Sequence, residues 1–178
     1  KRAHFMTKRF DRIGNDKLHL QTLCAIAHFD YNYSNAYSYE QAFQVMRELK
    51  LPHNEMEELY RRMVFNVVAR NQDDHTKNIS FLMDRNGTWS LSPAYDVTYA
   101  YDPTNKWMKA HQMSINGKRD NINKQDLLAL AKNMNIKRAK KIIDEVIGAV
   151  SKWELFATQA KIPANQIKAI ARTLLMEV

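Results

Sequence analysis

The stretch from Asn71 to Val97 holds the side chains of this sequence that are best suited to chemistry. It begins NQDDHTKN and ends SPAYDV, so it contains carboxylates at Asp73 and Asp96 and an amide at Asn78. Converging carboxylates repel one another unless a cation lies between them. Mg2+ takes such oxygen ligands, usually one or two carboxylates together with the phosphates of a substrate. The residue types therefore indicate a magnesium site that handles phosphate groups.

A β-hairpin is predicted between the two ends of this stretch. Apolar residues alternate with others over residues 79–83, and they do so again over residues 89–91. Asn86-Gly87 lies between these two runs, and Asn-Gly is the strongest short signal for a hairpin turn. We therefore expect two antiparallel strands joined by a turn in which Asn86 and Gly87 are the central residues.

The expected turn also predicts which residues face each other at the open end of the hairpin. Asn78 should lie opposite Tyr95, with Asp96 one residue further and Asp73 in the loop just before. The interval from Asp73 to Asn78 is that of the protein-kinase catalytic loop, in which the Asp lies near the accepting hydroxyl and the Asn binds metal. This interval selects Asp73 over Asp74, which fits a loop cap.

Longer blocks of sequence resemble the C-terminal lobe of the HipA family, bacterial Ser/Thr kinases that act as toxins in toxin–antitoxin pairs. The matching blocks are KRFDR at residues 8–12, DDHTKN at residues 73–78, GTW at residues 87–89, LSPAYDV at residues 91–97 and MSINGK at residues 113–118. The resemblance extends from about residue 5 to about residue 150. It implies that residues 1–178 are a mostly helical α+β lobe of protein-kinase type, whose hairpin carries the metal site.

The resemblance also implies an activity, the transfer of the ATP γ-phosphate to a protein hydroxyl with Mg2+ and ATP as cofactors. Asp73 would orient the hydroxyl and accept its proton, while Asn78 and Asp96 would hold Mg2+. His75 and Lys77 are further catalytic candidates. His75 fits either a phosphate contact or a structural histidine, and Lys77 fits either a charge on the transferred phosphate or a solvated loop lysine.

Nucleotide contacts are expected from Phe10, Asp11, His75 and Tyr95. Residues 4–10 are predicted to form a strand, and by resemblance this strand connects the two lobes of the kinase. Phe10 and Asp11 would then lie near the adenine and ribose, and Tyr95 would cover the adenine. Phe10 and Tyr95 also fit the alternative role of core aromatic residues.

Most of the remaining chain is predicted to be helical, apart from a loop at residues 31–35. The helix expected from Asn54 to about Ala69 is apolar on nearly all sides in its second half, so it should be buried and support the loop of Asp73. The other predicted helices start near Leu20, after a Ser38–Gln41 capping box, after an Asn123–Asp126 capping box, at Lys137 (a long helix to about Lys161) and at Pro163.

Composition limits the class of protein. A chain of 178 residues fits one domain. Cys24 is the sole cysteine, which excludes an intrachain disulfide and suits a reducing cytoplasm. No apolar run is long enough for a bilayer span, so no membrane partner is expected. The net charge of +8 attracts phosphates, nucleic acid or acidic protein, although a solvated basic face without a partner explains it equally well.

The glycines predict what the chain lacks. A kinase needs a glycine-rich loop over the phosphates, whereas the four glycines here are isolated from one another. The chain also opens on Lys1, which suggests a fragment without the nucleotide-covering N-terminal lobe. We therefore expect these residues to fold alone but to transfer no phosphate.

Partners and alternatives follow from the resemblance and from the basic tail. The expected partners are ATP, a protein substrate and a DNA-binding antitoxin that would bring DNA with it. Residues 99–109 fit either the docking segment for the protein substrate or a surface loop. One alternative is that residues 127–146 form a DNA-binding helix-turn-helix. Another alternative is that the chain is a catalytically inactive interaction domain. The basic side chains of the helix-turn-helix alternative are Lys137, Arg138, Lys140 and Lys141.

Overall fold

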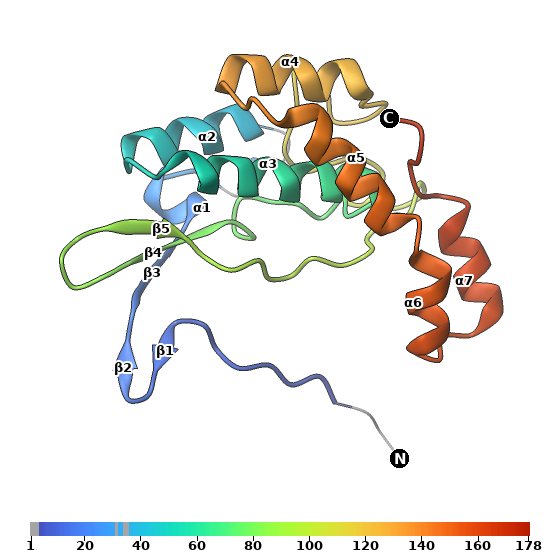
Figure 1. Cartoon of the computed structure of the whole chain (residues 1–178), viewed down its shortest axis with the longest axis horizontal. Helices are drawn as coiled ribbons and strands as arrows, with labels where there is room; N and C mark the ends of the chain where they lie inside the picture. Colours follow the sequence, from blue (N-terminus) through green and yellow to red (C-terminus); the bar gives the residue numbers. More distant parts are fainter. Residues whose placement is uncertain (1–3, 31, 34–35) are drawn as a thin grey trace.

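The computed structural model of this chain describes residues 4–30, 32–33 and 36–178. In this part of the chain it contains seven helices and two small antiparallel sheets (Figure 1). The strands are β1 (Arg12–Ile13), β2 (Asp16–Lys17), β3 (His19–Thr22), β4 (Ser80–Met83) and β5 (Trp89–Leu91). The helices are α1 (Leu23–Ile26), α2 (Tyr39–Glu48), α3 (His53–Val68), α4 (Lys124–Met134), α5 (Ala139–Val150), α6 (Trp153–Gln159) and α7 (Ala164–Ala171). The α+β class is as predicted, while the predicted loop at residues 31–35 lies partly outside the described residues.

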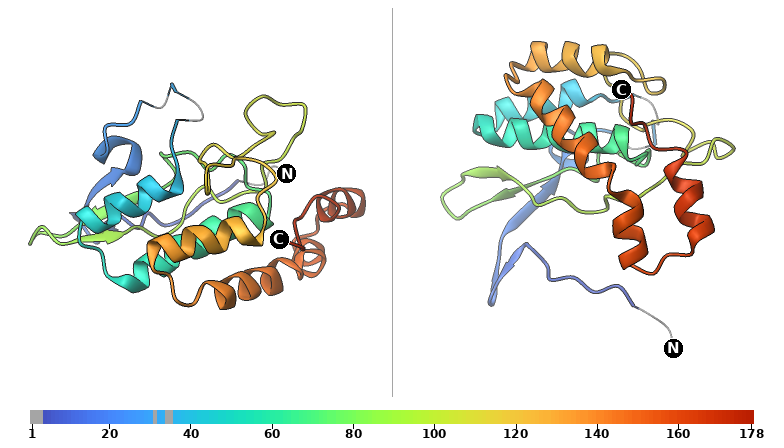
Figure 2. Two further views of the ribbon diagram at one scale, coloured as in Figure 1. Left: turned by 90° about the horizontal axis from the view of Figure 1, so that it is seen from above. Right: turned by 45° about the vertical axis from the view of Figure 1, so that its right-hand side comes forward.

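Helix α3 is the centre of the core. It packs against α2 and α5, and Figure 1 and the right-hand view of Figure 2 show α2 and α3 between α4 on one side and the β3–β4–β5 sheet on the other. Met63, Val64, Val67 and Val68 are fully buried, as the apolar second half of this helix predicts. The loop that follows α3 is therefore attached to a rigid support.

The β4–β5 hairpin is present, but its predicted register is wrong by one residue. Phe81 pairs with Leu91 and Met83 with Trp89, and the Asp84 N–H donates to the Thr88 carbonyl at 3.1 Å, so the turn is a three-residue loop of Arg85, Asn86 and Gly87. Gly87 has a φ of +81°. In this loop only Gly87 is left-handed, whereas the predicted two-residue turn requires positive φ at both central residues.

Asp84 stabilises the longer loop. Its carboxylate accepts the backbone N–H groups of Asn86 and Thr88, both at 2.8 Å. Because the register shifts, Asn78 is not opposite Tyr95. Regular pairing ends where the Ser92 N–H donates to the Ser80 carbonyl at 2.9 Å.

The N-terminal segment differs from its prediction. Residues 4–10 form no strand, and the side chains of Phe5 and Met6 are more than nine-tenths exposed. The strands of this region are the short β1–β2 hairpin and β3, which pairs with β4 along the register of Leu20 with Leu82. The helix predicted near Leu20 begins only at Leu23, because a partner strand far along the sequence takes the preceding residues into the sheet.

Two capping predictions are confirmed and one is wrong. Ser38 and Asn123 each begin a helix with a capping box, through Gln41 and Asp126. Asn54 is not a cap, because α3 already begins at His53. The N-cap position there belongs to Pro52, whose restricted φ suits the entry to a helix.

The long helix predicted from Lys137 to about Lys161 is two helices, α5 and α6. The break lies at Ser151 and Lys152, where the Ser151 hydroxyl donates to the Gly148 carbonyl at 3.0 Å. After the break Trp153 donates its indole N–H to the Ile167 carbonyl at 3.1 Å, which joins α6 to α7. The apolar spacing runs through both helices without interruption, so the break leaves no mark on the sequence pattern.

Candidate functional site

The loop after α3 is tied to the chain segment beyond Asp96. Arg70, at a φ of 57°, turns the chain out of the helix. The Ala100 N–H donates to the Arg70 carbonyl at 3.0 Å, and the Gln72 N–H donates to the Ala100 carbonyl at 3.1 Å. Arg70 also places its guanidinium over the ring of Tyr101, 4.4 Å from the ring centroid. These contacts fix the entry to the loop.

Backbone and side-chain hydrogen bonds also fix the far end of the loop. The Asn78 side-chain amide donates from Nδ2 to the Asp73 carbonyl at 3.0 Å, closing the loop on itself. The N–H groups at the start of α1 hold the next residues, since Cys24 donates to the Thr76 carbonyl and Leu23 to the Ile79 carbonyl. Because Nδ2 of Asn78 donates to a carbonyl, Oδ1 is the atom of this amide that would serve as a ligand for a cation.

Asp74 is the buried anchor of the loop. Its Oδ2 accepts the Tyr39 hydroxyl at 2.8 Å and lies 2.9 Å from His111 Nδ1, and its Oδ1 accepts the Gln112 N–H at 2.8 Å. Asn66 extends the network by donating to the Tyr39 hydroxyl oxygen at 2.9 Å. With its oxygens satisfied inside the protein, Asp74 is unsuited to accept a proton from a substrate, whereas Asp73 is half-buried.

The electrostatics of this network favour an ionised Asp74 and a protonated Tyr39. Burial by itself raises the pKa of the Asp74 carboxyl, but the neighbouring His111 and the donated hydrogen bonds outweigh burial and lower its pKa overall. Burial and the charge of Asp74 raise the pKa of the Tyr39 hydroxyl well above its ordinary value. Tyr39 therefore remains a donor to the carboxylate at neutral pH.

Asn78 and Asp96 line one small cavity of about 20 Å3, enough space for about one water molecule. His75 and Asn71 also line it, and His75 Nδ1 and Asn71 Oδ1 are buried atoms without a partner among the described residues. Asp73 is not part of the lining. The structure thus brings Asn78 and Asp96 together and attaches Asp73 to them through the Asn78 amide.

The donor set fits Mg2+ only in part. Among the described residues, no three His, Cys, Asp or Glu side chains are grouped so as to hold a metal ion. An amide oxygen from Asn78 and a carboxylate from Asp96 are hard oxygen donors, and Mg2+ usually takes its other ligands from water and phosphate. Asn78 and Asp96 would therefore supply two hard oxygen ligands, and the remaining ligands of a Mg2+ ion would have to come from water and phosphate.

Tyr95 connects the hairpin end to the loop and to the N-terminal segment. Its hydroxyl donates to the Lys77 carbonyl at 2.6 Å and also contacts the Ser80 hydroxyl. The rings of Phe10 and Tyr95 are tilted against each other with their centroids 5.9 Å apart. Asp96 follows in a left-handed conformation at a φ of 53° and is exposed. Phe10 and Tyr95 therefore lie near one another, with Asp96 next along the chain, and a nucleotide contact stays a prediction.

Asp11 is engaged by its neighbours in the chain. Its carboxylate accepts hydrogen bonds from Arg9, at 2.8 and 2.6 Å, and from Arg12. The hydrogen bond from Arg9 is the main reason why the pKa of the Asp11 carboxyl falls to about 2. Asp11 therefore stabilises the segment that carries Phe10, and a ribose contact stays a prediction.

Several residues that shape the site were not predicted from the sequence. Tyr39, Asn66, Arg70 and His111 hold the loop through contacts between distant segments, and no local spacing connects them. The one available signal was the presence of polar side chains in apolar surroundings, such as Asn66 within the buried half of α3. A buried polar residue of this kind needs a partner.

The structure is an α+β fold in which a buried helix, a polar loop and a hairpin place Asn78 and Asp96 at one small cavity. Residues 1–154 match the HipA-like C-terminal domain family, and the chain belongs to this family. No curated protein sequence gives a significant match.

A solved structure shares the fold. It is HipA of the Shewanella oneidensis MR-1 toxin–antitoxin system, in complex with HipB and its operator DNA, at a TM-score of 0.72 and 17% sequence identity. The match covers 93% of this chain and 45% of that HipA chain, so the present chain spans less than half the length of its relative. No helix within the described residues has the length and apolar character needed to cross a membrane.

Proposed function

We propose that this chain is the catalytic lobe of a HipA-like Ser/Thr protein kinase, which transfers the ATP γ-phosphate to a protein hydroxyl. The observation that carries the proposal is the shared cavity of Asn78 and Asp96, combined with the hydrogen bond from Asn78 to the Asp73 carbonyl. The spacing from Asp73 to Asn78 and the hairpin that leads to Asp96 match the order of parts in kinase sites. Burial of Asp74 supports the choice of Asp73 as the acid that meets the substrate.

Each residue has a defined task in this proposal. Asp73 orients the hydroxyl of the protein substrate and accepts its proton. Asn78 and Asp96 would hold Mg2+, which when bound neutralises charge on the phosphates. His75 and Lys77 would contact the phosphate being transferred. Positioning and electrostatics supply most of the acceleration, because phosphoryl transfer asks for little covalent chemistry from the protein.

The nucleotide would lie against the contact between the N-terminal segment and the hairpin end. Phe10 and Tyr95 present neighbouring rings for the adenine. Asp11 would reach the ribose only by giving up part of its bonding to Arg9 and Arg12, so we expect Phe10 and Tyr95 to contribute more than Asp11. His75 lines the cavity of Asn78 and would then lie on the side of the phosphates.

The test uses isosteric substitutions in the full-length gene product. Asp73→Asn should lower phosphate transfer about 100-fold or more, since general-base catalysis contributes about that much, and leave ATP affinity within about threefold. Asp96→Asn should lose Mg2+-dependent ATP binding as well. Transfer is measured with radiolabelled ATP and a protein substrate, and binding by calorimetry with and without Mg2+.

A matched control is available on α5. Asp144 is exposed and lies outside the site, so Asp144→Asn should behave as the unsubstituted protein in both assays. Full transfer activity in the Asp73→Asn protein would refute the kinase assignment. Unchanged Mg2+ dependence of ATP binding in the Asp96→Asn protein would refute the metal assignment.

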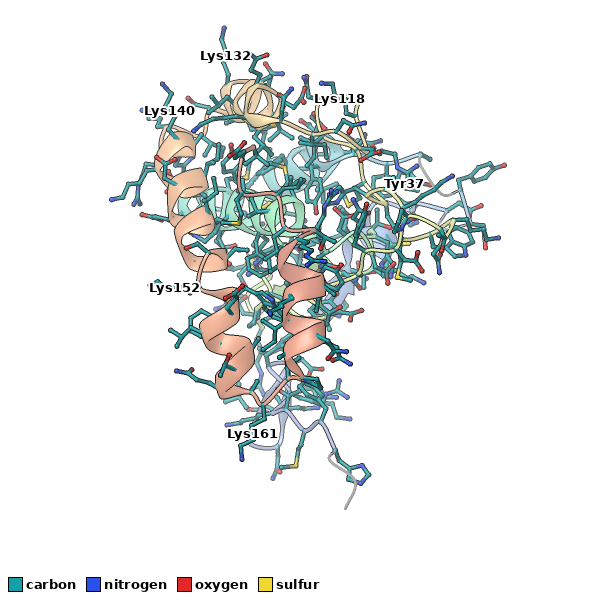
Figure 3. All side chains as sticks on the ribbon, turned by 90° about the vertical axis from the view of Figure 1, so that its right-hand side faces the viewer. Tyr37, Lys118, Lys132, Lys140, Lys152 and Lys161 are labelled. Atoms are coloured by element: carbon teal, nitrogen blue, oxygen red, sulfur yellow. The ribbon has the colours of Figure 1, made fainter. Side chains whose placement is uncertain are left out.

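A DNA-binding antitoxin is the partner we propose for this kinase, because the HipA relative is seen with HipB and operator DNA. The basic residues of the tail suit a partner that carries DNA. Lys137, Arg138, Lys140 and Lys141 are exposed at the turn into α5, and Lys132, Lys140, Lys152 and Lys161 lie along one outer edge of the molecule in Figure 3. Direct DNA binding by this chain would appear as affinity for arbitrary duplex that falls steeply with salt. Affinity for DNA only in the presence of the antitoxin would support the indirect arrangement.

A further inference from the structure

We propose that Asp74 is a positioning residue for Asp73, and that the pair of Asp74 with His111 couples the catalytic loop to the segment at residues 101–112. This inference rests on the proposed kinase function, because it concerns the geometry of the proposed catalytic base. It assigns a role to buried polar residues at the wall of the cavity that Asn78 and Asp96 share, whose side chains are bonded to other groups of the protein.

The burial of these groups is what makes their positions specific. The side chains of Asp74 and His111 are 1% and 2% exposed. Burying a carboxylate away from water costs free energy unless hydrogen bonds compensate it. When one partner of such a buried pair is removed, the remaining group is left without a hydrogen bond. Three donors from two distant segments meet on Asp74, so any displacement of the loop breaks several hydrogen bonds at once. The network therefore favours a single loop position.

Asp73 lies between two anchors. Its carbonyl oxygen accepts the Asn78 amide, and the next residue along the chain is Asp74, which is fixed by its own side chain. On the other side, Gln72 is bonded through its backbone to Ala100. The Asp73 side chain is thus the free member of a fixed loop, and the anchors around it determine where its carboxylate lies.

The same anchors hold both ends of the segment at residues 101–112. The segment starts directly after Ala100, which is bonded to Arg70 and Gln72, and it ends at His111 and Gln112, which are bonded to Asp74. Between these ends the segment is largely at the surface, with the Trp107 side chain about half exposed. A protein substrate that binds this segment would therefore act on the two ends of the loop that carries Asp73.

The first test compares two buried aspartates in the full-length gene product. Asp74→Asn should lower kcat at least tenfold and raise KM for the protein substrate, with ATP affinity changed less than twofold. Asp126 is the matched control, because it is also buried and accepts hydrogen bonds from Lys118, Asn116 and the Asn123 N–H on a helix away from the site. Asp126→Asn should lose stability to a similar degree and keep kcat within twofold.

A double-mutant cycle separates positioning from general structural support. If Asp74 acts through Asp73, Asp74→Asn should have little further effect on the residual single-turnover rate of an Asp73→Asn protein, because interacting residues are non-additive. Full additivity of the two substitutions would overturn the inference while leaving the kinase proposal intact. Unimpaired transfer by the Asp73→Asn protein alone would instead refute the kinase proposal, and with it the basis of this inference.

Hydrogen exchange provides a readout that does not depend on activity. In Asp74→Asn the Gln112 amide should exchange at least tenfold faster, together with neighbouring amides of the segment, while amides in α4 keep their rates. If Asp74→Asn does not fold, Tyr39→Phe is the variant to use, because it removes only one of the three donors to Asp74. It should give the same changes in kcat and in exchange at Gln112, with a smaller magnitude. Unchanged exchange at Gln112 and unchanged kcat in the variant that folds would overturn the inference.

Discussion

Asp73 and Asp74 are adjacent carboxylates with different environments. Asp74 is buried and accepts three hydrogen bonds, while Asp73 is half-buried beside the cavity that Asn78 and Asp96 share. A carboxylate that stabilises a fold needs satisfied oxygens, whereas one that meets a substrate needs an available oxygen. The structural role of Asp74 and the proposed catalytic role of Asp73 therefore follow from burial and not from residue type.

The Asp74 network predicts how stability depends on pH. A carboxyl whose pKa is lowered by folding stabilises the protein above its ordinary pKa of 3.8, and that contribution is lost as the pH falls toward the lower folded-state value. Asp74→Asn should therefore cost roughly 1–3 kcal/mol of unfolding free energy at pH 7. The difference in unfolding free energy between the variant and the unsubstituted protein should shrink below about pH 4. Only the unsubstituted protein has the Asp74 carboxyl, which takes up a proton on unfolding at that pH.

Urea unfolding of the two proteins between pH 7 and pH 3 measures this difference. The substitution Asp144→Asn, at an exposed position, controls for the change in net charge. A difference that stays constant, or grows on acidification, would show that Asp74 is not the ionised group described above.

The left-handed backbone at Asp96 gives a second prediction at the residue scale. Alanine is strained at a φ of 53°, whereas glycine adopts this conformation readily. Asp96→Gly should therefore be more stable than Asp96→Ala by about 1 kcal/mol, although both lose the proposed metal ligand. Thermal or urea unfolding of the two variants measures the gap. Equal stabilities would mean that the backbone relaxes out of the left-handed region when the side chain is removed.

Among the elements, the features set by neighbouring residues agree best with the structure. The capping boxes of α2 and α4 form as predicted because a cap needs only residues three positions apart. The β4–β5 hairpin also forms, but its register depends on which turn conformation Asn86 adopts. Two alternatives that differ by one residue use the same Asn-Gly pair, and the contacts of Asp84 favour the longer loop.

The caps can be tested as a matched pair. Asn123 accepts the N–H groups of Gln125 and Asp126 at the start of α4, so Asn123→Ala should cost about 1 kcal/mol of unfolding free energy. Asn54 lies inside the first turn of α3 and caps nothing, so Asn54→Ala should change stability by less than about 0.5 kcal/mol. Urea denaturation distinguishes the two. A loss at Asn54 as large as that at Asn123 would contradict the observed start of α3.

At the scale of the whole molecule, one connected core joins the helices and the hairpin. Side chains from α2, α3, the β4–β5 hairpin, α4 and α5 belong to the same buried cluster, and the C-terminal residues return to it where the Leu175 N–H donates to the Val68 carbonyl. The site residues are attached to this core through α3 and the loop after it. A core of this kind supports cooperative folding of the chain by itself.

We therefore predict that the purified 178-residue chain unfolds in a single cooperative transition but transfers no phosphate and binds ATP weakly. Its four glycines form no glycine-rich loop to cover the phosphates. The measurement is labelling with radiolabelled ATP, Mg2+ and a cell extract, with the full-length gene product as the positive control. Robust labelling by the chain alone would show that these residues organise the chemistry without a covering lobe.

The sequence by itself determined α2, α3, α4 and the presence of the β4–β5 hairpin, and it supplied the candidate site residues, because these depend on residue types and short spacings. The tertiary structure decided the pairing of β3 with β4, the break between α5 and α6, the hairpin register and the burial of Asp74. It also decided that Tyr39 and His111 would meet at that carboxylate. Each of these depends on contacts between residues far apart in the chain, whose free energies outweigh local preference and leave no periodic signal in the sequence.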